Sequence, residues 1–226
     1  MSKKIVVFAA HPDDETLGCG GTIARRKSEG YEVIIVVLTD GRHAFSKVLG
    51  ICSDPTPEEL KEIRREEVKR AARVLGVPER NLTFLDFEDS ILENFSKEAE
   101  EKIIPLLKKN SPSEIYYPYK KDANPDHTAA NQIVTNAANR SGLNSRRYQY
   151  SIMHKWSRIG PKIDALLSLL GQSRICVDIS NFLPLKKRAI EEFKSEIEII
   201  SNRQPEPILK DLDPWLKDTE IFYLDE

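Results

Sequence analysis

Disulfide frameworks and thiolate metal sites have little support in this sequence, which has three cysteines among 226 residues and no C-x-x-C pair. Long apolar runs are also missing, since no stretch approaches the roughly 18 residues that span a membrane. Basic and acidic residues number 34 and 36, so the formal net charge is -2. Such a balance leaves no electrostatic footprint for nucleic acid or an anionic membrane. We therefore expect neither nucleic acid nor a membrane among its partners.

The N-terminus superficially resembles a signal peptide, because Lys3 and Lys4 precede an apolar run at residues 5–10. The run is too short for the apolar region of a signal peptide, and it ends at His11 without a cleavable small-residue site. A buried strand explains the run better. A cytoplasmic protein is the default expectation.

Strand-like apolar runs alternate with amphipathic, helix-like stretches along the chain. The strands are expected at residues 5–10, 33–38, 82–86, 115–117, 148–153 and 175–179, and the helices at residues 20–29, 57–75, 97–109, 128–139 and 184–201. This alternation predicts an α/β fold with a mostly parallel sheet and helices on both faces. The length suits a single domain over residues 1–226. Residues 203–226 are expected to form a C-terminal elaboration, an irregular arm that ends in a short edge strand at residues 220–224.

Two histidine–aspartate clusters follow predicted strands. His11 and Asp14 come directly after the strand at residues 5–10, at a separation that puts two side chains on one side of a turn. His127 follows the strand at residues 115–117 and precedes a predicted helix. Open parallel sheets bind ligands at the carboxyl ends of their strands. We therefore expect His11, Asp14 and His127 to meet as three ligands of a divalent metal ion, with a fourth position open for water.

Two more carboxylates belong to these clusters. Asp13 is the spare acid beside the metal, where it can accept a proton as water becomes a nucleophile. Asp126 can orient a ligand imidazole by accepting a hydrogen bond from the ring nitrogen that does not bind the metal. Simpler interpretations exist, because a single histidine after a strand is more often a turn residue, and Asp13 and Asp14 could simply favour a helix N-terminus. Two clusters on one edge of the sheet favour the metal site.

Other candidate residues have simpler explanations. His43 follows another strand end and could border a pocket, and nothing marks His154 as a ligand, so both are left out of the metal site. The segment G-C-G-G at residues 18–21 is not a dinucleotide fingerprint, because Ile23 stands where G-x-G-x-x-G requires its third glycine. These glycines are expected to permit close packing of a helix on a strand.

Several motifs resemble the PIG-L/LmbE-like de-N-acetylases. The sequence AHPDDE at residues 10–15, followed by LGCGGT at residues 17–22, is similar to the opening signature of that family. Further matches are TDG at residues 39–41, R-x-x-E-x-x-x-A at residues 64–71, PDH at residues 125–127 and VDI at residues 177–179. The resemblance covers most of the chain and is most specific in its first 22 residues.

The resemblance implies a Rossmann-like, three-layer, zinc-dependent hydrolase that removes acetyl groups from N-acetylglucosamine conjugates. By position, the family's zinc ligands correspond to His11, Asp14 and His127. Asp13 is similar to its general base, and Asp126 to a residue that supports a ligand.

The resemblance also assigns a role to Arg64, which is similar to an arginine that approaches the substrate. Asn124 departs from the pattern, because the family often has a histidine there that helps polarise the amide carbonyl. An asparagine NH₂ can donate to an oxyanion but cannot carry a proton. Protonation of the leaving group then falls to Asp13 or to another acid. The segment FKSE at residues 193–196 also differs from the His-x-Ser-Gln often found there, which bears on substrate contacts or assembly.

The sequence leads to one main hypothesis and two alternatives. The main hypothesis is a metal-dependent hydrolase that removes the N-acetyl group from an N-acetylglucosamine-type conjugate, with Asp13 activating a zinc-bound water and Asn124 or Arg64 helping to hold the oxyanion. The alternatives are a metal-dependent amidase for a non-sugar amide and a catalytically inactive metal- or carbohydrate-binding homologue. Zn²⁺ is the expected cofactor, although a His₂Asp site accepts other divalent metals. The expected partner is a small amino-sugar substrate, and homo-oligomerisation is left open.

Overall fold

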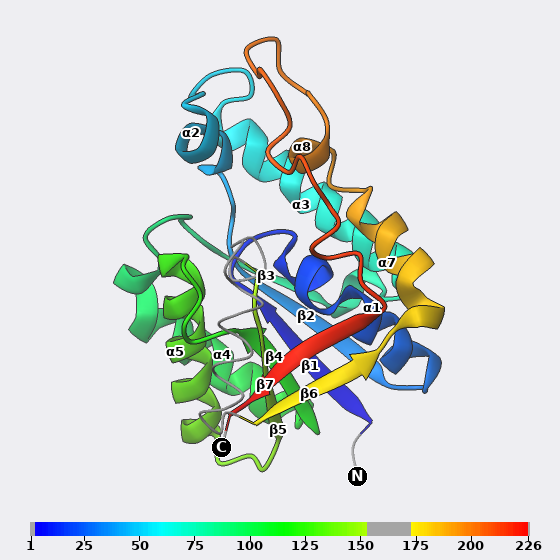
Figure 1. Ribbon diagram of the computed structural model, residues 1–226. Helices are drawn as coiled ribbons and strands as arrows, with labels where there is room; N and C mark the ends of the chain where they lie inside the picture. The colour runs from blue at the N-terminus through cyan, green and yellow to red at the C-terminus, as the bar shows by residue number, and fades with distance from the viewer. Residues whose placement is uncertain (1–2, 153–172, 226) are drawn as a thin grey trace.

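The computed structural model describes residues 3–152 and 173–225 of the protein (Figure 1). The strands are β1 (Lys4–Ala9), β2 (Glu32–Thr39), β3 (Leu82–Phe87), β4 (Glu114–Pro118), β5 (Arg146–Tyr150), β6 (Arg174–Asp178) and β7 (Thr219–Leu224). The α-helices are α1 (Asp14–Ser28), α2 (Ala44–Leu49), α3 (Pro57–Val74), α4 (Ser96–Asn110), α5 (Pro125–Ser141), α7 (Leu183–Ile190) and α8 (Lys194–Ile197). Short 3₁₀ turns are η1 (Glu79–Asn81), η2 (Leu92–Phe95) and η4 (Ser180–Phe182). Among the described helices, none is long and apolar enough to cross a membrane.

The strands form one seven-stranded sheet in the order β3-β2-β1-β4-β5-β7-β6. Strands β1 to β5 are parallel, whereas β7 runs antiparallel to both of its neighbours. The mostly parallel sheet predicted from the sequence is therefore confirmed. The chain leaves β1 toward β2 on one side and later returns to β4 on the other side. Such a reversal of strand order opens a crevice at the carboxyl ends of β1 and β4.

Helices cover both faces of this sheet (Figure 1). Alternate side chains of β1 point to opposite faces, so that Ile5 and Val7 pack in one core with α1, α3 and α7. Val6 and Phe8 pack in the other core with α4 and α5. Because β1 is apolar on both sides, it occupies the interior of the sheet. The predicted three-layer architecture is confirmed.

Three expectations about individual elements were wrong. The segment at residues 220–224 is not an edge strand, because β7 lies between β5 and β6 and buries Phe222. The first helix begins at Asp14 rather than at residue 20. The helix expected at residues 184–201 is two short helices, since the chain leaves the helical conformation at Phe193, whose buried ring packs in the core.

The glycines of α1 permit a close approach between that helix and the sheet, as predicted. A Cβ atom on Gly18 would lie 2.3 Å from Cδ2 of Tyr150, and one on Gly21 would lie 2.3 Å from Cδ1 of Ile179. The Tyr150 ring is held in place because its hydroxyl donates a hydrogen bond of 2.7 Å to the carbonyl of Phe8. The ring therefore cannot turn away to admit a methyl group at Gly18.

We expect Gly18→Ala to lower the free energy of unfolding by about 1–3 kcal/mol, because overpacking must displace the fixed Tyr150 ring. Gly20→Ala is the matched control, since it lies on the same helix and its Cβ would meet Lys186 Cγ at 3.1 Å. The better helix propensity of alanine, about 1 kcal/mol, offsets that milder contact. Urea unfolding of both variants measures the difference, and equal stabilities would contradict this packing.

Candidate metal centre

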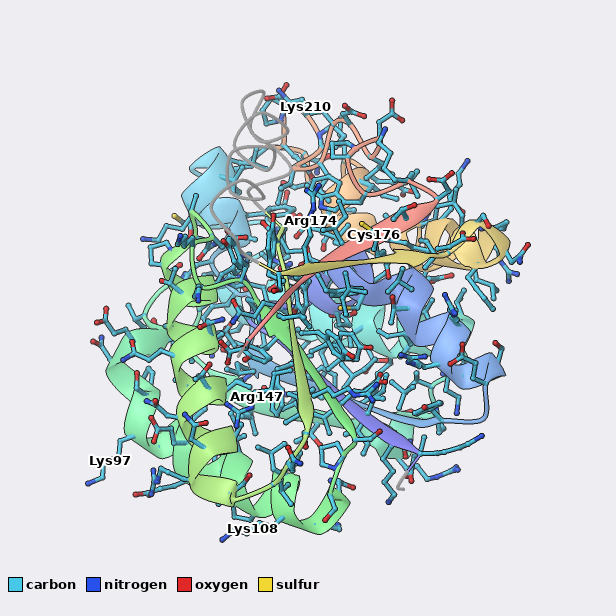
Figure 2. All side chains as sticks on the ribbon, turned by 60° about the horizontal axis from the view of Figure 1, so that its bottom comes forward. Lys97, Lys108, Arg147, Arg174, Cys176 and Lys210 are labelled. Carbon is cyan, nitrogen blue, oxygen red and sulfur yellow. The ribbon has the colours of Figure 1, made fainter. Side chains whose placement is uncertain are left out.

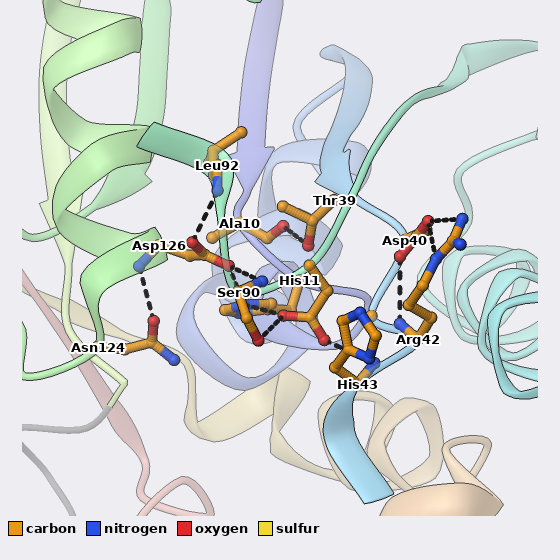
Figure 3. Close-up of polar contacts among 12 residues, drawn as sticks. Ala10, His11, Thr39, Asp40, Arg42, His43, Ser90, Leu92, Asn124 and Asp126 are labelled. Carbon is orange, nitrogen blue, oxygen red and sulfur yellow. Dashed lines mark hydrogen bonds and ion pairs between the residues drawn. The ribbon is translucent and has the colours of Figure 1, made fainter. Parts of the chain in front are cut away.

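The pairing of β1 with β4 brings the two predicted clusters together. These strands are parallel neighbours in the register Ile5↔Glu114 and Val7↔Tyr116, so their carboxyl ends lie at the same edge. His11 and Asp14 follow β1, and His127 lies in the first turn of α5, after β4. The loop after β1 is pinned at its start, because the backbone and hydroxyl of Thr39 both donate to the carbonyl of Ala10, at 2.9 and 2.7 Å (Figure 3).

The three predicted ligands present their polar atoms to one another at similar distances. His11 Nδ1 lies 3.2 Å from His127 Nε2 and 3.5 Å from Asp14 Oδ2. His127 Nε2 lies 3.3 Å from Asp14 Oδ1. Two ligands of a tetrahedral zinc ion, each at about 2.0–2.1 Å, lie about 3.4 Å apart. The spacing and the donor set therefore fit a tetrahedral divalent metal ion.

The opposite ring nitrogens of both histidines face carboxylates. His11 Nε2 lies 3.2 Å from Asp126 Oδ2 and 3.4 Å from Asp89 Oδ1, and His127 Nδ1 lies 3.2 Å from Asp122 Oδ1. A carboxylate on one nitrogen directs the other nitrogen, with its lone pair, toward the metal position. Asp126 thus lies where it can orient an imidazole, and the histidine it reaches is His11.

His11, Asp89 and Asp126 also lie close enough to be considered as a second metal group. The oxygens of Asp126 are already engaged, because they accept hydrogen bonds of 2.6 Å from Ser90 N and 3.1 Å from Leu92 N (Figure 3). Asp89 Oδ2 accepts the backbone N–H of His43 at 3.0 Å. These contacts favour a supporting role for the two carboxylates.

Asp89 and Asp122 were missed by the sequence reasoning. Both follow the carboxyl end of a strand, β3 and β4 respectively, and both are buried. That combination of an acidic residue with a strand end was the available signal. Neither residue stands beside a histidine in the sequence, so neither belongs to a compact His/Asp motif.

Asp13 adopts a rare backbone conformation in the loop between His11 and Asp14. Its φ of 128° lies in a region that residues other than glycine seldom adopt. Such a conformation costs of order 1–3 kcal/mol and persists only where surrounding contacts hold it. Here Arg64 Nη2 donates to the carbonyl of Pro12 at 2.6 Å, and Asp13 N donates to Glu15 Oε2 at 3.2 Å. These contacts thus hold Asp13 in a backbone conformation that is itself unfavourable.

Arg64 lies beneath this loop. A capping box between Thr56 and Glu59, with proline at the first helical position, fixes the start of α3. Arg64 lies on this helix, two turns after its start. The buried guanidinium contacts Asp13 Oδ2 at 3.0 Å and Glu196 Oε1 at 2.9 Å through one nitrogen. Its other terminal nitrogen donates to the carbonyl of Gly41 at 3.3 Å. Arg64 therefore contacts the loop after β1, the loop after β2 and α8. It also lines the cavity.

Glu67 lies one turn after Arg64 on α3 and is the glutamate of the R-x-x-E motif. Its carboxylate accepts the backbone N–H of Ser195 at 2.8 Å and the Ser195 hydroxyl at 2.6 Å. These bonds hold α8, and with it the neighbouring Glu196, against Arg64. The atypical segment at residues 193–196 is thereby joined to the site.

Asn124 and the two remaining histidines occupy different places. Asn124 caps α5, where its Oδ1 accepts the backbone N–H of Asp126 at 2.8 Å (Figure 3). The side chain also borders the cavity, as does His43, whose Nε2 lies 3.2 Å from Glu88 Oε1. His43 is not among the clustered metal-binding groups of the described residues. His154 lies outside those residues.

The metal cluster opens into a cavity of about 220 Å³. Polar side chains, among them Asp13, Asn124 and Glu196, line the cavity together with the three candidate ligands. Apolar side chains of the cavity come from several elements: Leu17, Val48, Ile152, Ile208, Leu209 and Trp215. The last three belong to the segment after α8, so the C-terminal elaboration forms part of the cavity wall.

Burial and charge shift the pKa values of the cluster in opposite directions. Burial tends to lower the pKa of His127, but Asp14 and Asp122 outweigh it and raise the pKa to about 9. Burial tends to raise the pKa of Asp14, but His127 and His11 lower it well below its usual range. For Asp13, burial prevails over the nearby Arg64 and raises the pKa well above its usual value. The spare carboxylate of Asp13 is therefore a stronger base than the neighbouring carboxylate of Asp14, which suits a proton acceptor.

Fold and site together define a class, the α/β proteins in which a histidine–aspartate cluster at the switch point of a mostly parallel sheet can hold a divalent metal ion. The chain belongs to the PIG-L family, since the family model described as GlcNAc-PI de-N-acetylase matches residues 6–138, more than half of the sequence. The family predicted from the motifs is confirmed.

Relatives and solved structures agree with this assignment. The chain is 27% identical to diacetylchitobiose deacetylase of Thermococcus kodakarensis, over 98% of this chain and 78% of that protein. It is 26% identical to a probable N-acetyl-alpha-D-glucosaminyl L-malate deacetylase 2 of Bacillus cereus, over 88% of this chain and 86% of that protein. The structure of N,N'-diacetylchitobiose deacetylase from Pyrococcus horikoshii matches with a TM-score of 0.72 and 25% identity, covering 99% of this chain and 84% of that chain.

Replacing Asp122 by asparagine tests the support of His127. We expect Asp122→Asn to weaken zinc binding by about 10–100-fold, because the neutral amide no longer fixes and polarises the imidazole. Glu88→Gln is the control, since that carboxylate pairs with His43 outside the cluster and its loss should leave the affinity unchanged. Competition with a chromogenic chelator measures the zinc dissociation constants of both variants. Equal affinities for Asp122→Asn and the wild type would contradict the assigned partner.

The raised pKa of His127 predicts a pH dependence for the metal-free protein. Folding favours the protonated ring, so its stabilising effect is complete below the unfolded pKa of about 6.5 and is lost as the pH rises through about 9. We expect the urea midpoint of metal-free protein to fall across this window. Zinc binds the neutral ring, so added zinc should raise the urea midpoint by more as the pH rises over the same range. His127→Gln should remove much of the slope, and a midpoint that rises with pH would refute the shift.

Proposed function

We propose that the protein is a metal-dependent hydrolase that removes the N-acetyl group from N-acetylglucosamine-type conjugates, releasing acetate and a free amine. The observation that carries the proposal is the position of Asp13, a buried carboxylate held in a strained loop between two candidate metal ligands. The substrate class is supported by the relatives, which are named as deacetylases of diacetylchitobiose and of an N-acetylglucosaminyl malate. Each of these substrates carries an acetylated amino sugar.

Zinc is the metal we propose for the cluster. His11, Asp14 and His127 would hold it, because two neutral imidazoles and one carboxylate suit zinc, and three protein ligands leave one position open. When bound, the ion supplies Lewis acidity, polarising the amide carbonyl and lowering the pKa of water to about 7. Asp126 and Asp122 keep the two imidazoles in the tautomers that this role requires.

Asp13 carries the proton through the reaction. It accepts a proton from the attacking water as the water oxygen bonds to the acetyl carbon. The protonated carboxyl then donates to the amide nitrogen as the C–N bond breaks, so that acetate leaves and the sugar retains an amine. Arg64 holds Asp13 Oδ2 and fixes the direction of the carboxylate. One residue therefore performs both proton transfers, which compensates for an Asn124 that cannot carry a proton.

Asn124 is the better of the two proposed donors to the oxyanion. Its Oδ1 is engaged in capping α5, which orients the amide and leaves Nδ2 as the donating atom. The terminal nitrogens of Arg64 already contact Pro12, Asp13, Gly41 and Glu196. A fixed neutral donor of this kind can stabilise developing negative charge without reorganising.

Acetate release from diacetylchitobiose and from N-acetylglucosaminyl malate tests the proposal. We expect Asp13→Asn to lower kcat by about 10²–10⁴-fold while retaining stoichiometric zinc, because only the proton acceptor is lost. His127→Ala should lose the metal together with the activity. Arg140→Gln, on the exposed end of α5, should behave as the wild type.

The same assay separates the alternatives. Equal rates for the wild type and Asp13→Asn would refute the mechanism. Faster hydrolysis of non-sugar acyl amides would indicate an amidase. Stoichiometric zinc and sugar binding without turnover would indicate a catalytically inactive binding protein.

A further inference from the structure

Strand β6 lies at one end of the described sheet and has β7 as its strand neighbour (Figure 1). Its residues are exposed except for Val177, and Ile175 keeps 37% of its surface accessible. Figure 2 shows Arg174 and Cys176 along this strand. The opposite end of the sheet is better covered, since β3 is half-buried over most of its length and Arg65 stacks on Phe84 at 4.4 Å.

The register with β7 shows which backbone groups of β6 point outward. Ser173 accepts a hydrogen bond from Leu224 N at 3.0 Å, and Ile179 N donates to Asp218 at 2.7 Å. Both bonds follow the antiparallel register in which Cys176 faces Ile221. Hydrogen-bonded pairs alternate along such a ladder, so residues with odd numbers bond to β7. The N–H and C=O groups of Arg174, Cys176 and Asp178 therefore point away from the sheet.

The sequence of β6 is self-complementary about its central residue. It reads Arg-Ile-Cys-Val-Asp over Arg174–Asp178, with opposite charges at its ends and apolar residues beside the centre. In an antiparallel pair of two such strands centred on Cys176, each Arg174 lies opposite Asp178 of the second copy. Ile175 lies opposite Val177 of the second copy on the other face. Outward backbone groups and matched side chains thus coincide in one register.

We propose that β6 pairs with β6 of a second copy of this chain, antiparallel and about a two-fold axis at Cys176, to make one sheet that continues across a dimer. The even-numbered residues supply the hydrogen bonds, and the two Arg174–Asp178 pairs set the register. In-register parallel pairing would place like charges side by side, and a shifted antiparallel pairing would separate the opposite ones.

Neighbouring contacts leave room for this pairing. The carbonyl of Asp178 accepts Arg25 Nη1 at 3.1 Å, and its carboxylate accepts Ser180 N at 2.9 Å. A carbonyl oxygen has a second lone pair, and a carboxylate can accept several bonds. The interface is small, so we expect a dimer that dissociates measurably on dilution.

Sedimentation velocity over a concentration series tests the proposal with two substitutions at one position. Cys176→Pro removes the outward N–H but leaves the bonds to β7, because Cys176 does not donate to that strand. We expect the wild type and Cys176→Ser to dimerise and Cys176→Pro to remain monomeric. A monomeric wild type at about 100 μM, or unchanged dimerisation of Cys176→Pro, would overturn the proposal.

Charge reversal provides a second, independent test in case the proline variant fails to fold. Arg174→Asp places two acids opposite each other at both ends of the pairing, so we expect at least about tenfold weaker dimerisation. The double variant Arg174→Asp/Asp178→Arg restores opposite charges and should recover dimerisation. No loss in the single variant would refute the register.

Crosslinking locates the axis. In a Cys52→Ser background, which removes the other exposed thiol, diamide should oxidise two Cys176 thiols of a dimer to one disulfide, itself taking up two electrons and two protons. The expected Cα separation of about 5.5 Å in a hydrogen-bonded pair suits a disulfide. Rapid formation of the crosslinked dimer supports the axis at Cys176. Its absence in a protein that sediments as a dimer would place the interface elsewhere.

Discussion

The parallel pairing of β1 with β4 is the interaction on which the site depends. It places the carboxyl ends of two strands side by side, although more than a hundred residues of chain separate them. Each strand is followed by a short loop that leads into a helix, so the polar side chains of both loops project into the same crevice. The histidine–aspartate cluster is the chemical consequence of this one backbone arrangement.

The balance of charge around the cluster favours the binding of a cation. Two histidines and one arginine face a larger number of buried carboxylates: Asp13, Asp14, Asp89, Asp122, Asp126 and Glu196. Buried charge is costly unless it is paired. Without a metal, the surrounding carboxylates raise the pKa values of the two histidines, which favours the protonated, charged rings. In the proposed function, a divalent ion between these ligands would replace those protons with fixed charge, and Asp13 would remain as the acid whose protonation changes during the reaction.

Membership of the PIG-L family and the departures from its pattern can be understood together. The opening motif accounts for two of the candidate ligands, His11 and Asp14, for the strained Asp13, and for the glycines that let α1 approach the sheet. Asn124 and Glu196, two of the residues that depart from the pattern, both border the cavity. Asn124 serves as a helix cap, and Glu196 shares Arg64 with Asp13. These residues thus preserve the local structure of the site while changing which groups can carry a proton.

The amino-acid sequence by itself determined the class of fold and most element positions, and it singled out His11, Asp14 and His127 as candidate metal ligands, because apolar periodicity and compact motifs are local properties. Only the tertiary structure decided that β7 lies inside the sheet and that Asp89 and Asp122 face His11 and His127. It also decided that Arg64 braces the loop of Asp13. These facts depend on which distant segments become neighbours, and that is settled by the strand order and the packing of the whole core. The residues around one position in the sequence do not reveal which distant residues it will contact.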